Sequence, residues 1–225
     1  MAGKNAYFVL RLFGEKIGKF KQDVLLPAAN ATVVDGHKLL SDAELQTVRT
    51  GACLTITMTW LRGIMTNKPF AYDSVPNAQN STLVKLAATA GKVHGAMKKE
   101  AAKSSAHKVR LDLAQRLKVP LSNEQCIADT TFDKATNALH LLQVGRGGLI
   151  SATANRVPTG EYIGKHAMGF HINRQGFLRF FDPNVGEYEV PLTDAKLFFD
   201  TFQGVLRDQQ AMEFRSTDLY VATLT

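Results

Sequence analysis

The stretch that decides the fold runs from residue 161 to residue 190 and reads EYIGKHAMGFHINRQGFLRFFDPNVGEYEV. Short apolar and aromatic runs alternate in it with turn residues, and NRQG at 173–176 connects two of these runs. Runs of this length between turn signals predict antiparallel strands joined by hairpins. LISATA at 149–154 and DLYVATL at 218–224 have the same character and extend the predicted sheet.

The first half of the chain is predicted to be helical. Ser41 followed three residues later by Glu44 matches a capping box and predicts a helix start. After Gly51, apolar residues at helical spacing predict a second helix, with Leu54, Met58, Leu61 and Met65 on one face. Further helices are predicted from about 81 to 119 with a break near 104–105, over 132–142, and from Thr193 onward. Helices first and an antiparallel sheet later predict an α+β fold.

Residues 1–40 are interpreted as an N-terminal extension or a first strand, and residues 41–225 as the main domain. The segment AYFVLRLF at 6–13 is predicted to be a strand, and the polar run that follows to His37 an irregular connection. The first twenty residues contain no unbroken apolar run, so we expect no cleavable signal peptide. Two cysteines among 225 residues are too few for a disulfide scaffold and are expected to be thiols.

The positive charge of the chain is concentrated in one segment. The formal net charge is +7, and residues 92–118 hold eight Lys and Arg against two Asp and Glu. We interpret this segment as a solvated helix face, or as a docking face for an acidic or membrane-associated partner. No Phe, Trp or Tyr occurs between Ala78 and Gln125, which argues against nucleic acid because stacking on bases has no platform there.

A candidate catalytic pair lies in the opening stretch. His166 and His171 are five residues apart, so in a regular strand they face opposite sides of the sheet and only one can serve a given site. Asp182 follows His166 across the predicted turn, where a neighbouring strand can place a carboxylate beside the imidazole. Such a carboxylate fixes the ring tautomer and stabilises the imidazolium. We therefore predict His166 as a general base and Asp182 as its orienting group.

Cys53 is the candidate nucleophile for this pair. It follows Gly51 and Ala52 at a predicted helix start, where free backbone N–H groups favour a thiolate and can bind an oxyanion. Cys126 lacks such a turn and is interpreted as an apolar filler. Five histidines are interpreted as structural or exposed: His37, His94, His107, His140 and His171.

These motifs together resemble the YopT-type papain-like cysteine proteases, which are bacterial effectors. The family pattern is a Gly-x-Cys helix start with a tryptophan seven residues on, then His-Ala in a strand, then Phe-Asp-Pro-Asn-x-Gly-Glu. The matching residues are Gly51, Cys53, Trp60, His166, Ala167, Phe181, Asp182, Pro183, Asn184, Gly186 and Glu187. The resemblance runs from about Ala43 to about Leu206, although residues 66–145 match only in length and helical character.

The resemblance implies a papain-like fold, in which an N-terminal helical part with the nucleophile helix packs on a C-terminal antiparallel sheet. It also implies a Cys53, His166 and Asp182 triad that forms an acyl-enzyme, with no cofactor and no metal. Papain-like enzymes usually place an amide five or six residues before the cysteine for the oxyanion hole, but Thr47 and Val48 occupy those positions here. Gln46, one residue earlier, is the predicted side-chain donor, together with the Cys53 backbone. Trp60 and Phe181 are interpreted as core residues.

The predicted function is that of a cysteine endopeptidase acting as a secreted bacterial effector or toxin. It would be made in the bacterial cytoplasm, delivered into a target cell without a cleavable signal, and would cleave a specific protein there. A cognate inhibitor or immunity protein, or a chaperone, is an expected partner. Two alternatives stay open: an acyltransferase, transglutaminase or glutamine deamidase using the same triad, and a non-catalytic basic binding module.

Overall fold

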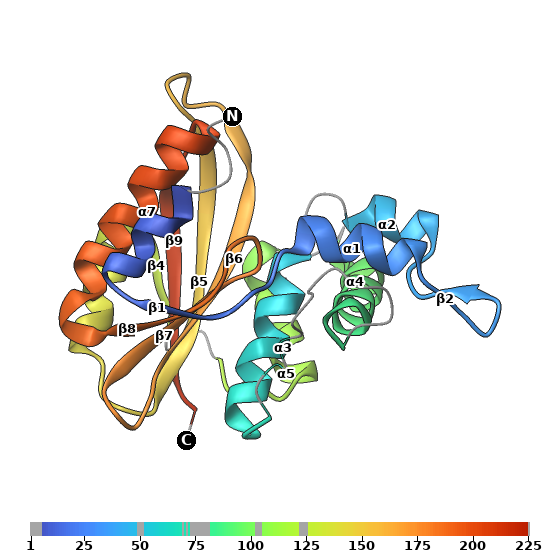
Figure 1. Cartoon of the computed structure of the whole chain (residues 1–225), viewed down its shortest axis with the longest axis horizontal. Helices are drawn as coiled ribbons and strands as arrows, with labels where there is room; N and C mark the ends of the chain where they lie inside the picture. Colours follow the sequence, from blue (N-terminus) through green and yellow to red (C-terminus); the bar gives the residue numbers. More distant parts are fainter. Residues whose placement is uncertain are drawn as a thin grey trace.

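A seven-stranded antiparallel sheet forms the centre of the molecule (Figure 1). The computed structural model describes residues 6–48, 52–68, 70, 72, 82–101, 105–121 and 126–224. The strand order is β1-β8-β7-β6-β5-β9-β4. Their bounds are β1 (Glu15–Gly18), β4 (Cys126–Thr131), β5 (Arg146–Arg156), β6 (Tyr162–Ile172), β7 (Phe177–Asp182), β8 (Gly186–Pro191) and β9 (Met212–Thr223).

Helices cover both faces of this sheet, and each face has its own hydrophobic core (Figure 1). On one face pack η1 (Ala6–Leu12), α6 (Phe132–Asn137), η3 (Ala138–Leu141), η4 (Leu192–Asp194) and α7 (Ala195–Gln210). The other face carries a larger helical layer of α1 (Gln22–Ala31), α2 (Asp42–Val48), α3 (Cys53–Met65), α4 (Thr82–Ala101) and α5 (Ala106–Arg116). Within that layer α3 lies directly on β6. The chain therefore has the α+β architecture expected from the sequence.

The hairpin of β6 and β7 has the predicted form. Gly169 pairs with Phe181 and Ile172 with Leu178, and the backbone N–H of Asn173 donates to the Phe177 carbonyl across the turn at 2.9 Å. The β7 strand ends at Asp182, where a tight turn leads into β8. The hairpin thus brings the end of β7 beside the middle of β6.

The N-terminal region differs from the sequence-based expectation. The segment predicted as a strand at 6–13 is mostly a 3-10 helix, because Leu10 is buried in the core beneath α7. The run expected to be irregular contains β1, which pairs with β8, and α1, which packs on α4. The strand β4 was also not predicted. The domain boundary at residue 41 stays a prediction.

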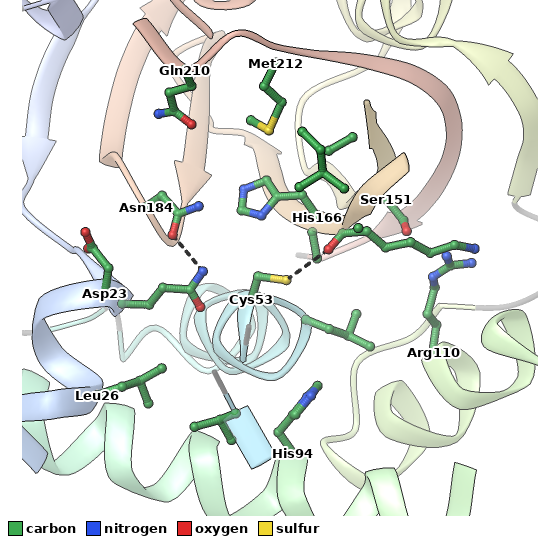
Figure 2. A pocket seen from close by; sticks show the side chains of 18 of the residues that line it. Asp23, Leu26, Cys53, His94, Arg110, Ser151, His166, Asn184, Gln210 and Met212 are labelled. Carbon is green, nitrogen blue, oxygen red and sulfur yellow. Dashed lines mark hydrogen bonds between the residues drawn. The ribbon is translucent and has the colours of Figure 1, made fainter. Parts of the chain in front are cut away.

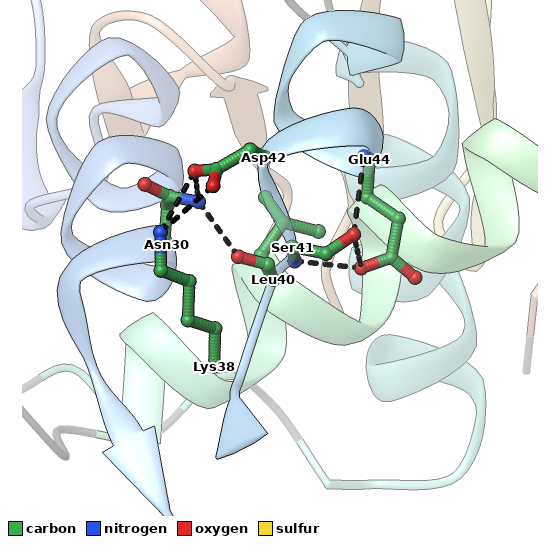
Figure 3. Close-up of polar contacts among 6 residues, drawn as sticks. All are labelled: Asn30, Lys38, Leu40, Ser41, Asp42 and Glu44. Carbon is green, nitrogen blue, oxygen red and sulfur yellow. Dashed lines mark hydrogen bonds and ion pairs between the residues drawn. The ribbon is translucent and has the colours of Figure 1, made fainter. Parts of the chain in front are cut away.

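The predicted capping box at the start of α2 is confirmed (Figure 3). The Ser41 backbone N–H donates to Glu44 Oε2 at 2.8 Å, and the Glu44 N–H donates to Ser41 Oγ at 3.3 Å. Asn30 near the end of α1 donates from Nδ2 to both Asp42 Oδ1 and the Leu40 carbonyl, each at 2.9 Å. These contacts fix the end of α1 against the start of α2, and both helices form one wall of the cleft described below. In the chain, the short strands β2 (Val33–Val34) and β3 (His37–Lys38) come between these two helices.

The basic segment 92–118 is not a uniform solvated face. Arg110 is buried, and its Nη1 donates to Asp218 Oδ2 at 2.9 Å and to Tyr220 Oη at 3.2 Å. Lys92 and Lys108 are exposed, whereas the side chains of residues 98–100 and residue 103 lie outside the described part of the chain. In the part that is described, no helix combines the length and apolar character that crossing a bilayer requires.

Candidate active site

Cys53 is the first residue of α3 and faces strand β6. Thr57, one turn later, donates from Oγ1 to the Ala167 carbonyl at 3.0 Å, which holds the helix against the strand. The Cys53 thiol lies 3.9 Å from the Lys165 carbonyl and is 7% exposed. The predicted position of the cysteine at a helix start is therefore confirmed, while Gly51 lies outside the described residues.

His166 and Asp182 form a buried hydrogen-bonded pair beside this cysteine. His166 Nε2 and Asp182 Oδ2 are 2.8 Å apart, and their side chains are 11% and 2% exposed. The imidazole also stacks on Phe214 of β9, with ring centroids 5.7 Å apart and an interplanar angle of 6°. Because Nε2 faces the carboxylate, Nδ1 is the ring nitrogen that remains for Cys53. His171 does not line the cleft, in agreement with the expected alternation along the strand.

The electrostatic environment favours a protonated His166. Burial alone would lower the pKa of this imidazole, but the charge of Asp182, its hydrogen bond and the contact with Cys53 outweigh burial and raise the pKa to about 10. The imidazolium therefore persists at neutral pH. A positively charged ring beside a sulfur supplies the counter-charge that a thiolate nucleophile requires.

The turn after β7 holds Asp182 in place. The backbone N–H of Asn184 donates to Asp182 Oδ1 at 2.6 Å, and the N–H of Val185 donates to the Asp182 carbonyl at 3.1 Å. Gly186 closes the turn at a φ of +112°, and a Cβ there would lie 2.4 Å from the Gly18 carbonyl oxygen. Only glycine fits this position, since both the left-handed backbone and the contact with β1 exclude a side chain.

Cys53, His166 and Asn184 line a cleft of about 1190 Å³ between the helical layer and the sheet (Figure 2). His166 and Asn184 reach it from the sheet, and Figure 2 shows both near Cys53, with Gln210 and Met212 beyond them. The helical side contributes apolar side chains at its wall: Leu26, Pro27, Leu45, Val48 and Leu54. The arrangement places a thiol, an imidazole and a mostly apolar groove where an extended peptide could lie.

Gln46, the fourth predicted site residue, does not lie in the cleft. Gln46 is exposed on α2 and is not among the residues that line the cleft in the described part of the chain. Its assignment to the oxyanion hole stays a prediction. Another glutamine, Gln22 at the start of α1, does line the cleft, as does His94 of α4, which the sequence had suggested to be structural. No local motif marks Gln22, because its place depends on contacts with the distant turn after β7.

The two aromatic residues interpreted as core are confirmed as such. Trp60 and Phe181 are fully buried, and their rings stack with centroids 5.4 Å apart. Glu187, the last residue of the family motif, is also fully buried, where its carboxylate contacts Arg179 and Tyr72. These residues support the site from within the core and do not line the cleft.

A helical layer that brings a cysteine to a histidine on an antiparallel sheet defines the papain-like cysteine protease class, and the fold of this chain belongs to that class. The chain is a member of the family Peptidase_C58, described as Yersinia/Haemophilus virulence surface antigen, whose model matches residues 19–219. The resemblance to YopT-type proteases is thereby confirmed.

Solved structures that are similar to this chain include the following two. The Pseudomonas avirulence protein AvrPphB matches with a TM-score of 0.52 and 13% identity, over 78% of this chain and 94% of that one. PatoxP, a cysteine protease-like domain of the Photorhabdus asymbiotica toxin PaTox, matches with a TM-score of 0.33 and 13% identity, over 87% of this chain and 56% of that one. No curated protein matches the sequence.

Proposed function

We propose that this protein is a thiol endopeptidase with Cys53 as nucleophile, His166 as acid and base, and Asp182 as the group that orients His166. The observation that carries the proposal is the hydrogen-bonded pair of His166 and the buried Asp182, with His166 and Cys53 lining one cleft. Membership in a peptidase family supports the same reaction. The raised pKa of His166 fits a site in which an imidazolium lies beside the nucleophilic sulfur.

The reaction would proceed through an acyl-enzyme. The Cys53 thiolate attacks the peptide carbonyl carbon, and the carbonyl oxygen takes up the negative charge. As the C–N bond breaks, the His166 imidazolium gives its proton to the leaving amine. His166 then removes a proton from water, which attacks the thioester, releases the carboxylate product and regenerates the cysteine. Asp182 stabilises the imidazolium through the first half of this cycle.

We propose further that the protein acts as a bacterial effector or toxin on a protein in a target cell. The virulence-related description of its family supports this role. Delivery into the target cell and a cognate inhibitor or chaperone belong to the same proposal. The exposed lysines of the basic segment 92–118, which include Lys92 and Lys108, favour an acidic or membrane-associated target.

The first test is to map new protein termini. Purified wild-type protein and the Cys53→Ala variant would be incubated with lysates of eukaryotic and of bacterial cells, and new N-termini identified by mass spectrometry. Cys126→Ala is the matched control, since it removes the other thiol. New termini that require Cys53 but not Cys126 would support a protease and reveal its target. Folded protein that generates none in either lysate would contradict endopeptidase activity, and deamidation or acyl transfer in the same samples would point to the alternative chemistry.

A further inference from the structure

Gln22 is a buried polar residue in the cleft with no role in the triad. It is the first residue of α1, is 8% exposed, and lines the same cleft as Cys53 and His166. Long polar side chains are seldom buried unless their groups have partners or a function. The contacts of this side chain therefore indicate what it does.

Two hydrogen bonds attach Gln22 to the turn that holds Asp182. Its backbone N–H donates to the Pro183 carbonyl at 2.8 Å, and its side-chain Nε2 donates to Asn184 Oδ1 at 2.7 Å. Figure 2 shows the second of these bonds as a dashed line at Asn184, close to Cys53. Since the Asn184 backbone N–H in turn donates to Asp182, one chain of hydrogen bonds links the Gln22 amide to the catalytic pair.

The amide of Gln22 keeps hydrogen-bonding capacity that the described part of the protein does not use. A primary amide has two N–H donors and one carbonyl acceptor. Asn184 accepts one of the N–H groups, and Gln22 Oε1 is buried without a hydrogen-bond partner. A buried carbonyl without a partner costs free energy unless a ligand supplies one. The free face of the amide thus fits a peptide group, which offers both an acceptor oxygen and an N–H.

We infer that Gln22 is the side-chain donor of the oxyanion hole, a role that rests on the proposed thiol protease function. One Nε2 N–H donates to the oxygen that becomes negative when Cys53 attacks, alongside the backbone N–H of Cys53 at the start of α3. The bonds to Pro183 and Asn184 hold the donor rigid before the substrate arrives, which is the condition for effective charge stabilisation. The donor then comes from a separate helix and not from the segment just before the cysteine.

Two reactions of Cys53 can distinguish an oxyanion donor at Gln22 from a residue that only supports the structure of the site. With p-nitrophenyl acetate, the thiolate forms a C–S bond to the carbonyl carbon, the oxygen becomes an oxyanion, and p-nitrophenolate leaves. With iodoacetamide, the thiolate displaces iodide from a saturated carbon and no oxyanion forms. Loss of an oxyanion donor slows only the first reaction, whereas damage to the triad slows both.

The experiment measures both rates in four variants. Gln22→Ala removes the amide, and Gln22→Glu keeps its length, retains an oxygen to which Asn184 Nδ2 can donate, and lacks the N–H donors. Gln46→Ala tests the rival assignment, and Gln115→Ala, on the exposed face of α5, is the matched control. Both Gln22 variants should lose acylation about a hundredfold to a thousandfold, and Gln22→Ala, which introduces no charge, should keep the rate and pH profile of alkylation. Gln115→Ala should react as the wild type does.

Four outcomes would overturn the inference. Equal loss of acylation and alkylation in both Gln22 variants would mean that Gln22 only positions the triad. Unchanged acylation in a folded Gln22→Glu variant, or loss in Gln46→Ala alone, would assign the donor elsewhere. A wild-type protein in which Cys53 reacts with neither reagent would overturn the proposed function itself, and the inference with it.

Discussion

The indole ring of Trp60 stacks on the phenyl ring of Phe181, with centroids 5.4 Å apart and an interplanar angle of 12°. Trp60 lies about two turns after Cys53 on α3, and Phe181 immediately precedes Asp182 on β7. One buried contact therefore connects the element that carries the nucleophile to the strand that ends at the carboxylate. This packing therefore helps to set the spacing between Cys53 and His166.

Replacing Gly169 by Ala should disturb that packing. A Cβ at Gly169 on β6 would lie 2.7 Å from Trp60 ring carbons, so the indole or the helix must move. Overpacking of this kind costs about 1 to 3 kcal/mol of unfolding free energy, which urea denaturation would measure. Gly164→Ala on the same strand is the control, because nothing lies within 4 Å of a Cβ there. Equal stability of the two variants would contradict a rigid α3 and β6 contact.

Asp182→Asn should reduce turnover strongly while leaving the fold intact. The amide has nearly the same shape but cannot stabilise the imidazolium, and a loss of about 10³- to 10⁴-fold in kcat is expected. The assay is cleavage of the substrate found from the new termini. Asp200→Asn, an exposed position on α7, should cleave at the wild-type rate. Retention of most activity by Asp182→Asn would remove Asp182 from the triad.

The stability of the protein should depend on pH through His166. Its pKa is about 10 in the folded protein against 6.5 for the free side chain. The folded state therefore keeps a proton that the unfolded chain releases, so this stabilisation is complete below pH 6.5 and is lost as pH rises through 10. The slope is at most about 1.4 kcal/mol per pH unit. Urea unfolding across this range would measure it.

The matched variant for this measurement is His166→Gln, which should lack the contribution of His166 to the slope. Lys16, whose pKa burial lowers to about 8, titrates in the same range with the opposite sign. The difference between the wild type and His166→Gln is therefore the informative quantity, since Lys16 is common to both. Parallel pH profiles for the two proteins would show that folding does not raise the pKa of His166.

Ser41→Ala should destabilise the wall of the cleft formed by α2. The substitution removes the Oγ acceptor of the capping box, and such changes cost about 1 kcal/mol. Thermal unfolding would detect the loss as a lower Tm. Glu44→Gln is the matched control, because a glutamine oxygen can still accept from the Ser41 N–H. An unchanged Tm in Ser41→Ala with a lower Tm in Glu44→Gln would mean that charge, and not the cap, stabilises this helix end.

Local sequence signals predicted the parts of the site that local structure determines. The turn residues at 173–176 and the glycine at 186 specify the hairpin and the turn after it, and the hairpin brings His166 near Asp182. The apolar spacing after Cys53 specified α3 in spite of its β-branched residues. Such signals depend only on residues close together in the chain, and so they can be recognised in a single sequence.

The parts that could not be predicted depend on contacts between distant segments. Strand β1 is only four residues long and pairs with β8 near the other end of the chain. Helix α1 contains Pro27, which argues locally against a helix, and packing on α4 outweighs that preference. Gln22 reaches the cleft only because its partners, Pro183 and Asn184, belong to the turn after β7.

The strand β1 also makes this edge of the sheet a short one, because it covers β8 and is itself only four residues long. β8 is largely buried, and β1 occupies its outer edge. Without β1, the N–H and C=O groups on the outer edge of β8 would be unpaired. Such groups can form hydrogen bonds with a strand of another molecule, and this pairing can start aggregation. The four residues Glu15–Gly18 are therefore expected to contribute to solubility as well as to the fold. Their loss is expected to cause self-association of the protein.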